Sequence, residues 1–177
     1  MSETLRIATF TLSDTRTRVD DVGGRLLREK LEAAGFAIAL HDILREDSDS
    51  LRETIHHTCD SNVADAIILT GGTGIAPRDR TIEVLEPMFS KTIDGFGEAF
   101  RRLSWDAIGP RAILSRATAG IIRGHVVVAL PGSPQAVELA IDTLIAPMLH
   151  HAVALASGRG GKHASHGHHH HASEKKH

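Results

Sequence analysis

AIILTGGTGIAPRD, residues 66–79, joins a short apolar run to a turn rich in glycine. Such a run is typical of a strand buried on both faces, as in the parallel sheets of α/β proteins. Gly71, Gly72 and Gly74 lack side chains where the backbone can approach a ligand. Backbone N–H groups beside a helix N-terminus bind anions, because the first helical amides have no internal partners. We therefore expect Gly71, Gly72, Thr73 and Gly74 to bind a ligand that carries phosphate.

The spacing of these glycines excludes two familiar phosphate loops. The chain contains no G-x-x-x-x-G-K-[ST], and Pro77 stands where the dinucleotide fingerprint has its third glycine. Taken alone, the turn leaves open a tight connection between strand and helix that binds nothing.

Two other apolar segments end in the same way. Residues 5–12 (LRIATFTL) and 125–130 (HVVVAL) are strand candidates with polar or glycine-containing exits. Those exits contain Ser13, Asp14, Pro131, Gly132 and Ser133. Ser133 is a good N-cap and Pro134 suits the first helical position, so a helix begins where the strand ends. In an open parallel sheet such exits line the carboxyl edge, where ligands bind.

The order of elements predicts the fold class. A strand at 37–44 and helices before and after it give the alternation β-α-β-α-β through Thr70. For these helices we expect an N-cap at Asp20 or Asp21 and a capping box of Ser50 with Glu53. We predict an α/β fold with a mostly parallel sheet and helices on both faces, a Rossmann-like arrangement of three layers.

The second half of the chain has a weaker pattern. It predicts a short helix over 82–89 strained by Pro87, a helix through Phe96 and Phe100 that ends at Gly109, a strand or hairpin within 113–122, and a last helix from Pro134. Pro147 is expected to start a new turn or to kink that last helix.

Composition sets further bounds. The 177 residues suit one domain, for which we predict residues 1–157, followed by a disordered His-rich tail over 158–177. The tail is read either as a solvated segment or as a metal store. A net charge of −2 gives no sign of nucleic-acid binding. The single Cys59 cannot form an internal disulfide and is expected on the core-facing side of its helix; no apolar run of membrane-spanning length is expected, so we predict a cytoplasmic protein.

Five motifs in order carry a family resemblance. They are TLSDTRT (11–17), TGGTG with PRD (70–74 and 77–79), GFGEAFR (95–101), LSRATAG (114–120) and PGSP (131–134). Together they resemble the molybdenum cofactor biosynthesis family, and most of all its protein B branch, which is related to molybdopterin adenylyltransferase and to a domain of gephyrin. The resemblance covers about residues 5–156.

The resemblance implies molybdopterin as substrate and, for adenylyltransferase members, transfer of AMP from ATP with Mg²⁺. It implies Asp79, Glu46 and Asp47 as catalytic carboxylates, with Asp79 and Glu46 on the metal. Ser115 and Arg116 become candidates for a phosphate clamp. Adenylyltransferases commonly have Pro-Asp where this chain has Arg45-Glu46, so Glu46 is a departure that affects turnover more than binding.

Other interpretations stay open at this stage. Asp79 is also placed to cap the helix that follows it, and Glu46 and Asp47 lie in an acidic stretch whose ordinary role is solvated charge. A molybdopterin carrier without catalysis is the main alternative function, and a nucleotide-responsive scaffold or metal-sequestering protein is a third. The family also implies a homotrimer or homohexamer, with apolar candidates for the interface at Ile82, Leu85, Phe89 and Trp105.

Overall fold

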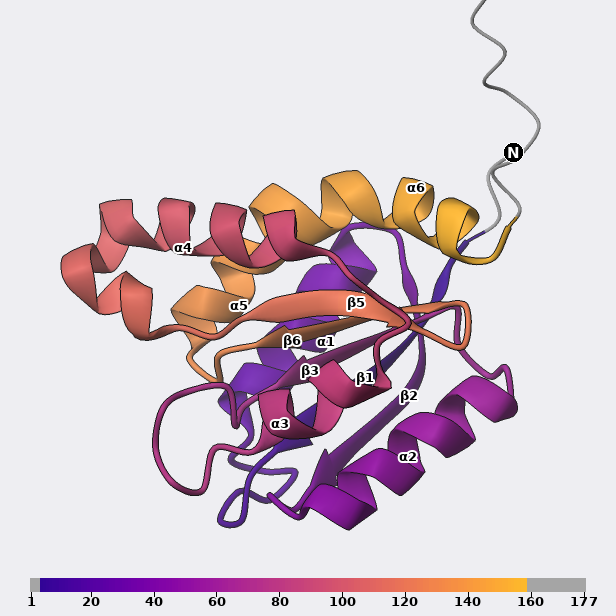
Figure 1. Ribbon diagram of the computed structural model, residues 1–177, viewed down its shortest axis with the longest axis horizontal. Helices are drawn as coiled ribbons and strands as arrows, with labels where there is room; N and C mark the ends of the chain where they lie inside the picture. The colour runs from indigo at the N-terminus through magenta and orange to yellow at the C-terminus, as the bar shows by residue number, and fades with distance from the viewer. Residues whose placement is uncertain (1–3, 159–177) are drawn as a thin grey trace, which may run out of the picture.

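Six β-strands form one sheet in the computed structural model, which describes residues 4–158 (Figure 1). The strands are β1 (Arg6–Leu12), β2 (Ala37–Leu44), β3 (Ala66–Thr70), β4 (Lys91–Thr92), β5 (Thr118–Ile122) and β6 (His125–Leu130). Their order across the sheet is β2-β1-β3-β6-β5-β4. β2, β1, β3 and β6 run parallel, and β5 and β4 extend the sheet in antiparallel pairs. The mostly parallel α/β sheet predicted from the sequence is thus confirmed.

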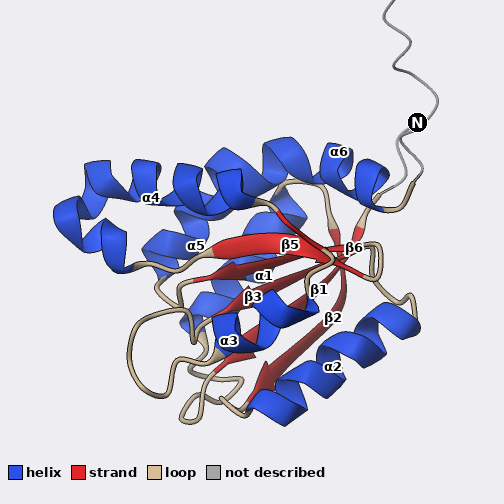
Figure 2. Ribbon diagram, in the orientation of Figure 1, coloured by secondary structure: helices blue, strands red, loops and turns tan. Residues whose placement is uncertain are grey.

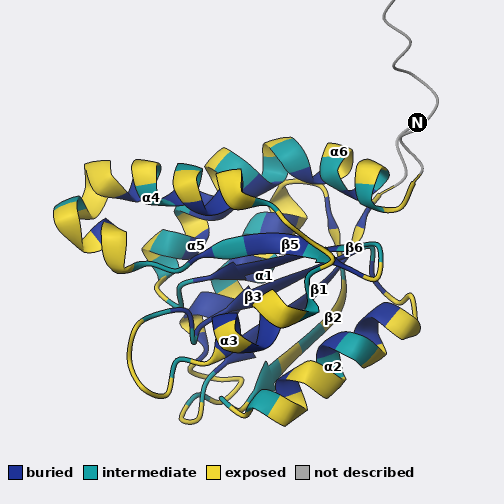
Figure 3. Ribbon diagram, viewed as in Figure 1, coloured by how far each residue is buried: buried dark blue, intermediate teal, exposed yellow. Residues whose placement is uncertain are grey.

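The helices connect these strands (Figure 2). They are α1 (Val22–Ala33), α2 (Ser48–Asp60), α3 (Thr81–Leu85), α4 (Asp94–Ile108), α5 (Pro134–Ala140) and α6 (Ala146–Ala156), with short irregular helical turns η1 (Glu86–Met88), η2 (Gly109–Leu114) and η3 (Ile141–Ile145). α1, α4, α5 and α6 cover one face of the sheet, while α2 and α3 cover the other. Each face has its own hydrophobic cluster, so the central strands are buried on both sides (Figure 3).

The β5–β6 hairpin turns at Arg123 and Gly124, as expected. Both residues have positive φ, 48° and 80°, which suits the twist of a tight hairpin. The strand starts only at Thr118, because the chain first makes the 3₁₀ turn η2 after α4 ends at Gly109. Gly109 has a φ of 60°, a conformation that favours glycine and stops the helix.

The last helical segment, α5 through α6, has a proline in the first turn of α6. Pro147 lacks an N–H for a regular helical hydrogen bond, and the wider π turn η3 precedes it. Over Pro134–Ala156, 23 residues with mean hydropathy 1.5, this segment is long and apolar enough to cross a membrane by length and composition. It is not a continuous apolar run, because Gln135, Glu138 and Asp142 interrupt it, so the expectation of no such run is not contradicted. Its buried residues recur every four positions and pack on the sheet, which is the pattern of an amphipathic core helix: Val137, Ile141, Ile145, Leu149 and Val153.

One local expectation changes in α2 and another is confirmed. The helix begins at Ser48 with Asp47 as its N-cap, and Ser50 N donates to Asp47 Oδ2 at 2.8 Å, so Ser50 is inside the helix rather than its cap. Cys59 packs with the core beside Ile55, and burial raises the pKa of its thiol to about 11. Cys59 is therefore a packed core residue, as the sequence predicts.

The proposed interface residues divide into two groups. Ile82 and Leu85 are buried in the cluster under α2 and α3, and Phe89 packs against it, so these apolar side chains serve the protein's own core. Trp105 on α4 is 48% exposed. The last helix ends at Ala156, just before the predicted domain end at residue 157. The predicted tail lies outside the described residues from 159 onward.

Candidate ligand-binding cleft

Three loops meet at the carboxyl edge of the sheet, after β1, β3 and β6. Gly71 brings them together: its φ is 101°, and a Cβ there would lie 2.4 Å from the Leu12 carbonyl oxygen. Gly71 N donates to Leu130 O at 3.0 Å, and a Cβ on Gly132 would lie 3.4 Å from the Gly71 Cα. The chain leaves β1 toward β2 and leaves β3 in the opposite direction, so the loops diverge at a topological switch point. The predicted convergence of the three exits is confirmed.

A cleft of about 860 Å³ opens at this edge. Its size suits a nucleotide or a ligand of similar mass. Most residues singled out from the sequence line it: Ser13, Asp14, Glu46, Gly71, Gly72, Thr73, Gly74, Asp79, Ser115, Pro131, Gly132 and Ser133. Asp47 and Arg116 are not among its lining residues.

Arg116 supports the loop between β3 and α3. Its Nε donates to Gly74 O at 2.9 Å, Nη2 donates to Asp79 O at 3.3 Å, and Nη1 donates to Glu83 Oε1 at 2.5 Å. The guanidinium lowers the pKa of Glu83 through this hydrogen bond. Arg116 therefore uses its donors to hold the loop between β3 and α3 in place. The sequence suggested instead that it binds a phosphate of the ligand.

Asp79 closes a turn within the same loop. Its Oδ2 accepts a hydrogen bond from Ala76 N at 2.8 Å. α3 begins at Thr81, its N-cap is Arg80, and no side chain caps it. The reading of Asp79 as the cap of that helix is therefore wrong, and its carboxylate lies at the cleft instead.

Thr81 ties the start of α3 to the glycine turn. Its Oγ1 donates to Gly71 O at 3.0 Å, and its N donates to Gly72 O at 3.1 Å. A Cβ on Gly72 would lie 2.3 Å from that hydroxyl oxygen, so the contact needs glycine. The turn is fixed from both sides before any ligand arrives.

Two carboxylates lie where the loops after β1 and β2 meet at the cleft. Asp14 Oδ1 accepts a hydrogen bond from Glu46 N at 3.1 Å, which links the loops after β1 and β2. Glu46 Oε2 is buried and has no hydrogen-bond partner among residues 4–158. Burial, and next the Asp14 carboxylate, raise the pKa of Glu46, with Asp79 adding to the shift and Arg78 opposing it. Within residues 4–158 Glu46 forms no ion pair, and Arg78 is the cation that acts on its carboxylate from a longer distance.

This donor set fits a hard cation that is completed by its substrate. Within residues 4–158 no group of three or more His, Cys, Asp or Glu side chains is arranged to hold a metal. Mg²⁺ commonly takes one or two protein carboxylates and fills its other positions with water and substrate phosphates. The unpartnered oxygen of Glu46, in the same cleft as Asp79, meets that requirement.

Several lining residues were not singled out from the sequence. Two are arginines, Arg16 and Arg111, and four are apolar: Phe100, Ile108, Leu114 and Leu139; Arg78 of the PRD motif also lines the cleft. Arg16 and Arg78 lie inside the motifs TLSDTRT and PRD, which was a usable signal. Phe100 and Ile108 follow helical spacing on α4, which by itself indicates only a core face.

Glycine loops, arginines and carboxylates at the switch point of a parallel sheet define a class of α/β protein that binds phosphorylated ligands at the carboxyl edge. Comparison with known proteins narrows that class. Residues 6–151 match the family model described as a probable molybdopterin binding domain. The chain belongs to this family of molybdenum cofactor biosynthesis proteins.

Relatives and solved structures agree with this assignment. Molybdenum cofactor biosynthesis protein B of Bacillus subtilis (strain 168) is 47% identical over 150 residues, covering 84% of this chain and 88% of the relative. The same-named protein of Staphylococcus carnosus (strain TM300) is 43% identical over 152 residues, covering 84% and 89%. A crystal structure of molybdenum cofactor biosynthesis protein B matches with a TM-score of 0.85 and 39% identity over 88% of this chain and 98% of the other. The tungsten cofactor synthesizing protein of Pyrococcus furiosus matches with a TM-score of 0.79 and 34% identity, with the same coverage.

Proposed function

We propose that this protein binds molybdopterin in the cleft and transfers AMP from MgATP to its terminal phosphate. The observation that carries the proposal is the gathering of a glycine turn, the carboxylates of Asp79 and Glu46, and three arginines around one cleft. Adenylyl transfer needs an anion cradle, oxygen ligands for a cation, and positive charge near the transferred group.

Each part of the cleft has a role in this reaction. Backbone N–H groups of Gly72, Thr73 and Gly74 would hold phosphate oxygens, while Gly71 N already donates to Leu130 O. Asp79 and Glu46 would hold Mg²⁺, which when bound neutralises charge on the triphosphate. The apolar side beside Phe100 and Leu139 would pack against the flat pterin ring.

The test is formation of adenylylated molybdopterin and pyrophosphate from ATP, measured with and without molybdopterin. We expect turnover only with both substrates and Mg²⁺. Glu46→Asp should keep or raise the rate, because it restores the shorter carboxylate common in adenylyltransferases. Asp106→Asn is a matched control, since this exposed carboxylate pairs with Arg102 and does not line the cleft.

A molybdopterin carrier without catalysis is the second candidate, and one observation favours it. Asp47 is the N-cap of α2, and its side chain accepts a hydrogen bond from Ser50 N, so it is not placed to replace Glu46 as the catalytic carboxylate. Tight molybdopterin binding without transfer in the wild type, Glu46→Asp and Asp79→Asn alike would establish the carrier.

We further propose a cytoplasmic protein that self-associates as a homotrimer or homohexamer. The support is the exposed apolar surface at Trp105 on α4 and at Ile113 on η2, which are 48% and 66% exposed. Exposed side chains of this size favour contact with another protein surface.

A further inference from the structure

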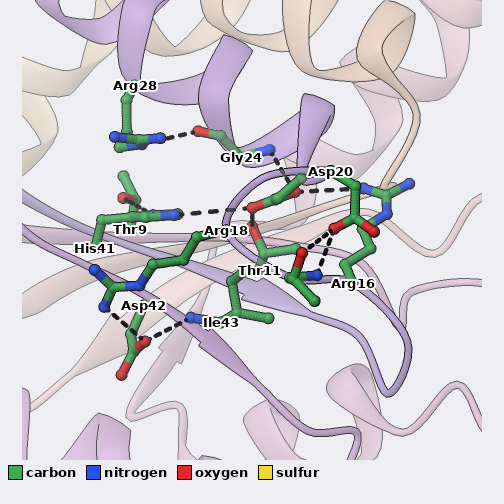
Figure 4. Close-up of polar contacts among 12 residues, drawn as sticks. Thr9, Thr11, Arg16, Arg18, Asp20, Gly24, Arg28, His41, Asp42 and Ile43 are labelled. Carbon is green, nitrogen blue, oxygen red and sulfur yellow. Dashed lines mark hydrogen bonds and ion pairs between the residues drawn. The ribbon is translucent and has the colours of Figure 1, made fainter.

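A buried carboxylate lies below the cleft, at the start of α1. The side chain of Asp21 is 2% exposed, and it is the N-cap of this helix. Its Oδ1 accepts a hydrogen bond from Gly24 N at 2.9 Å, and its Oδ2 accepts one from Thr11 Oγ1 at 2.7 Å. Figure 4 labels the residues of the two donors, Thr11 on β1 and Gly24 on α1. Both oxygens are therefore fixed in position.

Arg16 lies between this carboxylate and the cleft. Its Nη1 is 3.5 Å from Asp21 Oδ1, its side chain is 36% exposed, and it lines the cleft. The Arg16 backbone N donates to Ser13 Oγ at 3.1 Å, which holds the loop after β1. Apart from the long contact with Asp21, the guanidinium donates no hydrogen bond to the described residues. Nη1 of the guanidinium is attracted to the Asp21 carboxylate, and its other N–H groups remain available to a ligand.

Two glycines of α1 make room for this arrangement. A Cβ on Gly24 would lie 2.1 Å from Asp21 Oδ2, and one on Gly23 would lie 3.2 Å from Arg16 Nη1. The same Cβ on Gly23 would lie 3.1 Å from Gly132 O, in the loop after β6. Glycine inside a helix costs about 0.5–1 kcal/mol relative to alanine. The contacts that a Cβ would block here offset that cost. The guanidinium thus sits beside one of the three loops that form the floor of the cleft.

His41 on β2 lies near Asp21 but does not supply a positive charge to it. Its Nε2 is 3.8 Å from Asp21 Oδ2, and its Nδ1 lies 3.0 Å from Thr9 Oγ1 (Figure 4). Burial, and next the charge of Arg28, lower the pKa of His41, so its ring is neutral near pH 7. Arg16 is then the cation in contact with this buried carboxylate.

We infer that Arg16 binds a phosphate group of the ligand in the cleft and that Asp21 is the residue that positions it. The planar guanidinium matches a phosphate in a two-point contact, and a fixed carboxylate behind it limits its rotation. The inference rests on the proposed function only for the identity of the ligand, because the anion site is defined by these residues alone.

The experiment compares Arg16→Gln, Asp21→Asn and Arg18→Gln for binding of molybdopterin and of inorganic pyrophosphate by calorimetry. Arg18→Gln is the matched control, because this arginine is on the same loop, pairs with Asp42 and does not line the cleft. We expect Arg16→Gln to raise both Kd values at least about tenfold, as for loss of one charged hydrogen bond. Asp21→Asn keeps the shape and one acceptor oxygen for Gly24 N, while its amide nitrogen can donate to Thr11 Oγ1, whose hydroxyl also accepts, so we expect a smaller rise of about threefold to tenfold.

A double-mutant cycle separates positioning from a structural role. If Asp21 acts through Arg16, Asp21→Asn adds little to Kd once Arg16→Gln is present. Additive effects, or wild-type Kd values in folded Arg16→Gln, overturn the inference, as does equal weakening in Arg18→Gln. Wild-type protein that binds pyrophosphate but not molybdopterin overturns the proposed function. In that case, weaker pyrophosphate binding in Arg16→Gln than in the wild type and Arg18→Gln still supports the inference.

Discussion

Asp79→Asn separates the two roles that the structure gives this carboxylate, in the loop and in the cleft. The Asn side chain keeps an oxygen for the hydrogen bond from Ala76 N, which is 2.8 Å long in the wild type. That bond contributes about 1 kcal/mol, so Asp79→Asn should unfold near the wild-type temperature while Asp79→Ala loses about 1 kcal/mol. For a domain of this size the loss lowers Tm by about 2–4 °C.

The effect on catalysis should be large for both substitutions, in contrast to their different effects on stability. Both substitutions remove the negative charge, so both should slow adenylyl transfer at least about 10²-fold, which is about 2.7 kcal/mol of activation free energy. The assay is single-turnover formation of adenylylated molybdopterin at saturating ATP and Mg²⁺, with calorimetric unfolding of the same samples and Asp106→Asn as control. Normal turnover in Asp79→Asn would refute the reasoning and leave Asp79 as a residue that only closes its loop.

Four other predictions follow from particular features of the chain. The raised pKa of Glu46 means that the folded state holds this proton to higher pH than the unfolded chain, so stability falls as pH rises through that range. Without ligand, Glu46→Gln should therefore have a higher Tm than the wild type at pH 7 and the same Tm near pH 4. A variant with the wild-type Tm at pH 7 as well as at pH 4 would contradict this. Gly71→Ala places a Cβ 2.4 Å from a backbone oxygen at a φ of 101°, so chemical denaturation should show a loss of at least about 2 kcal/mol, against little change in Gly95→Ala, whose Cβ meets nothing within 4 Å. Deletion of residues 158–177 should leave Tm and molybdopterin affinity unchanged and remove most retention on a nickel column, and failure to fold would show that the domain boundary is wrong. Light scattering at micromolar concentration should give a trimer or hexamer, and a species of 19.0 kDa would contradict self-association.

The sequence by itself determined the layers of the fold and the edge that carries the cleft. Apolar segments such as residues 66–70 are short, rich in branched side chains and bounded by glycine, and that pattern suits few structures other than a buried parallel strand. The position of Ser133 before Pro134 fixed the start of α5, because capping depends on residues within one turn. Local signals of this kind survive without knowledge of the rest of the chain.

Contacts between distant segments were decided only by the tertiary structure. Arg116 turned out to brace the loop of Gly74 and Asp79, which lies about forty residues earlier in the chain. The contact of Arg16 with Asp21 depends on two glycines that bring α1 against the loop after β6. A long, flexible arginine reaches many partners at similar cost, so its choice is set by the packed backbone around it and has no signature in neighbouring residues.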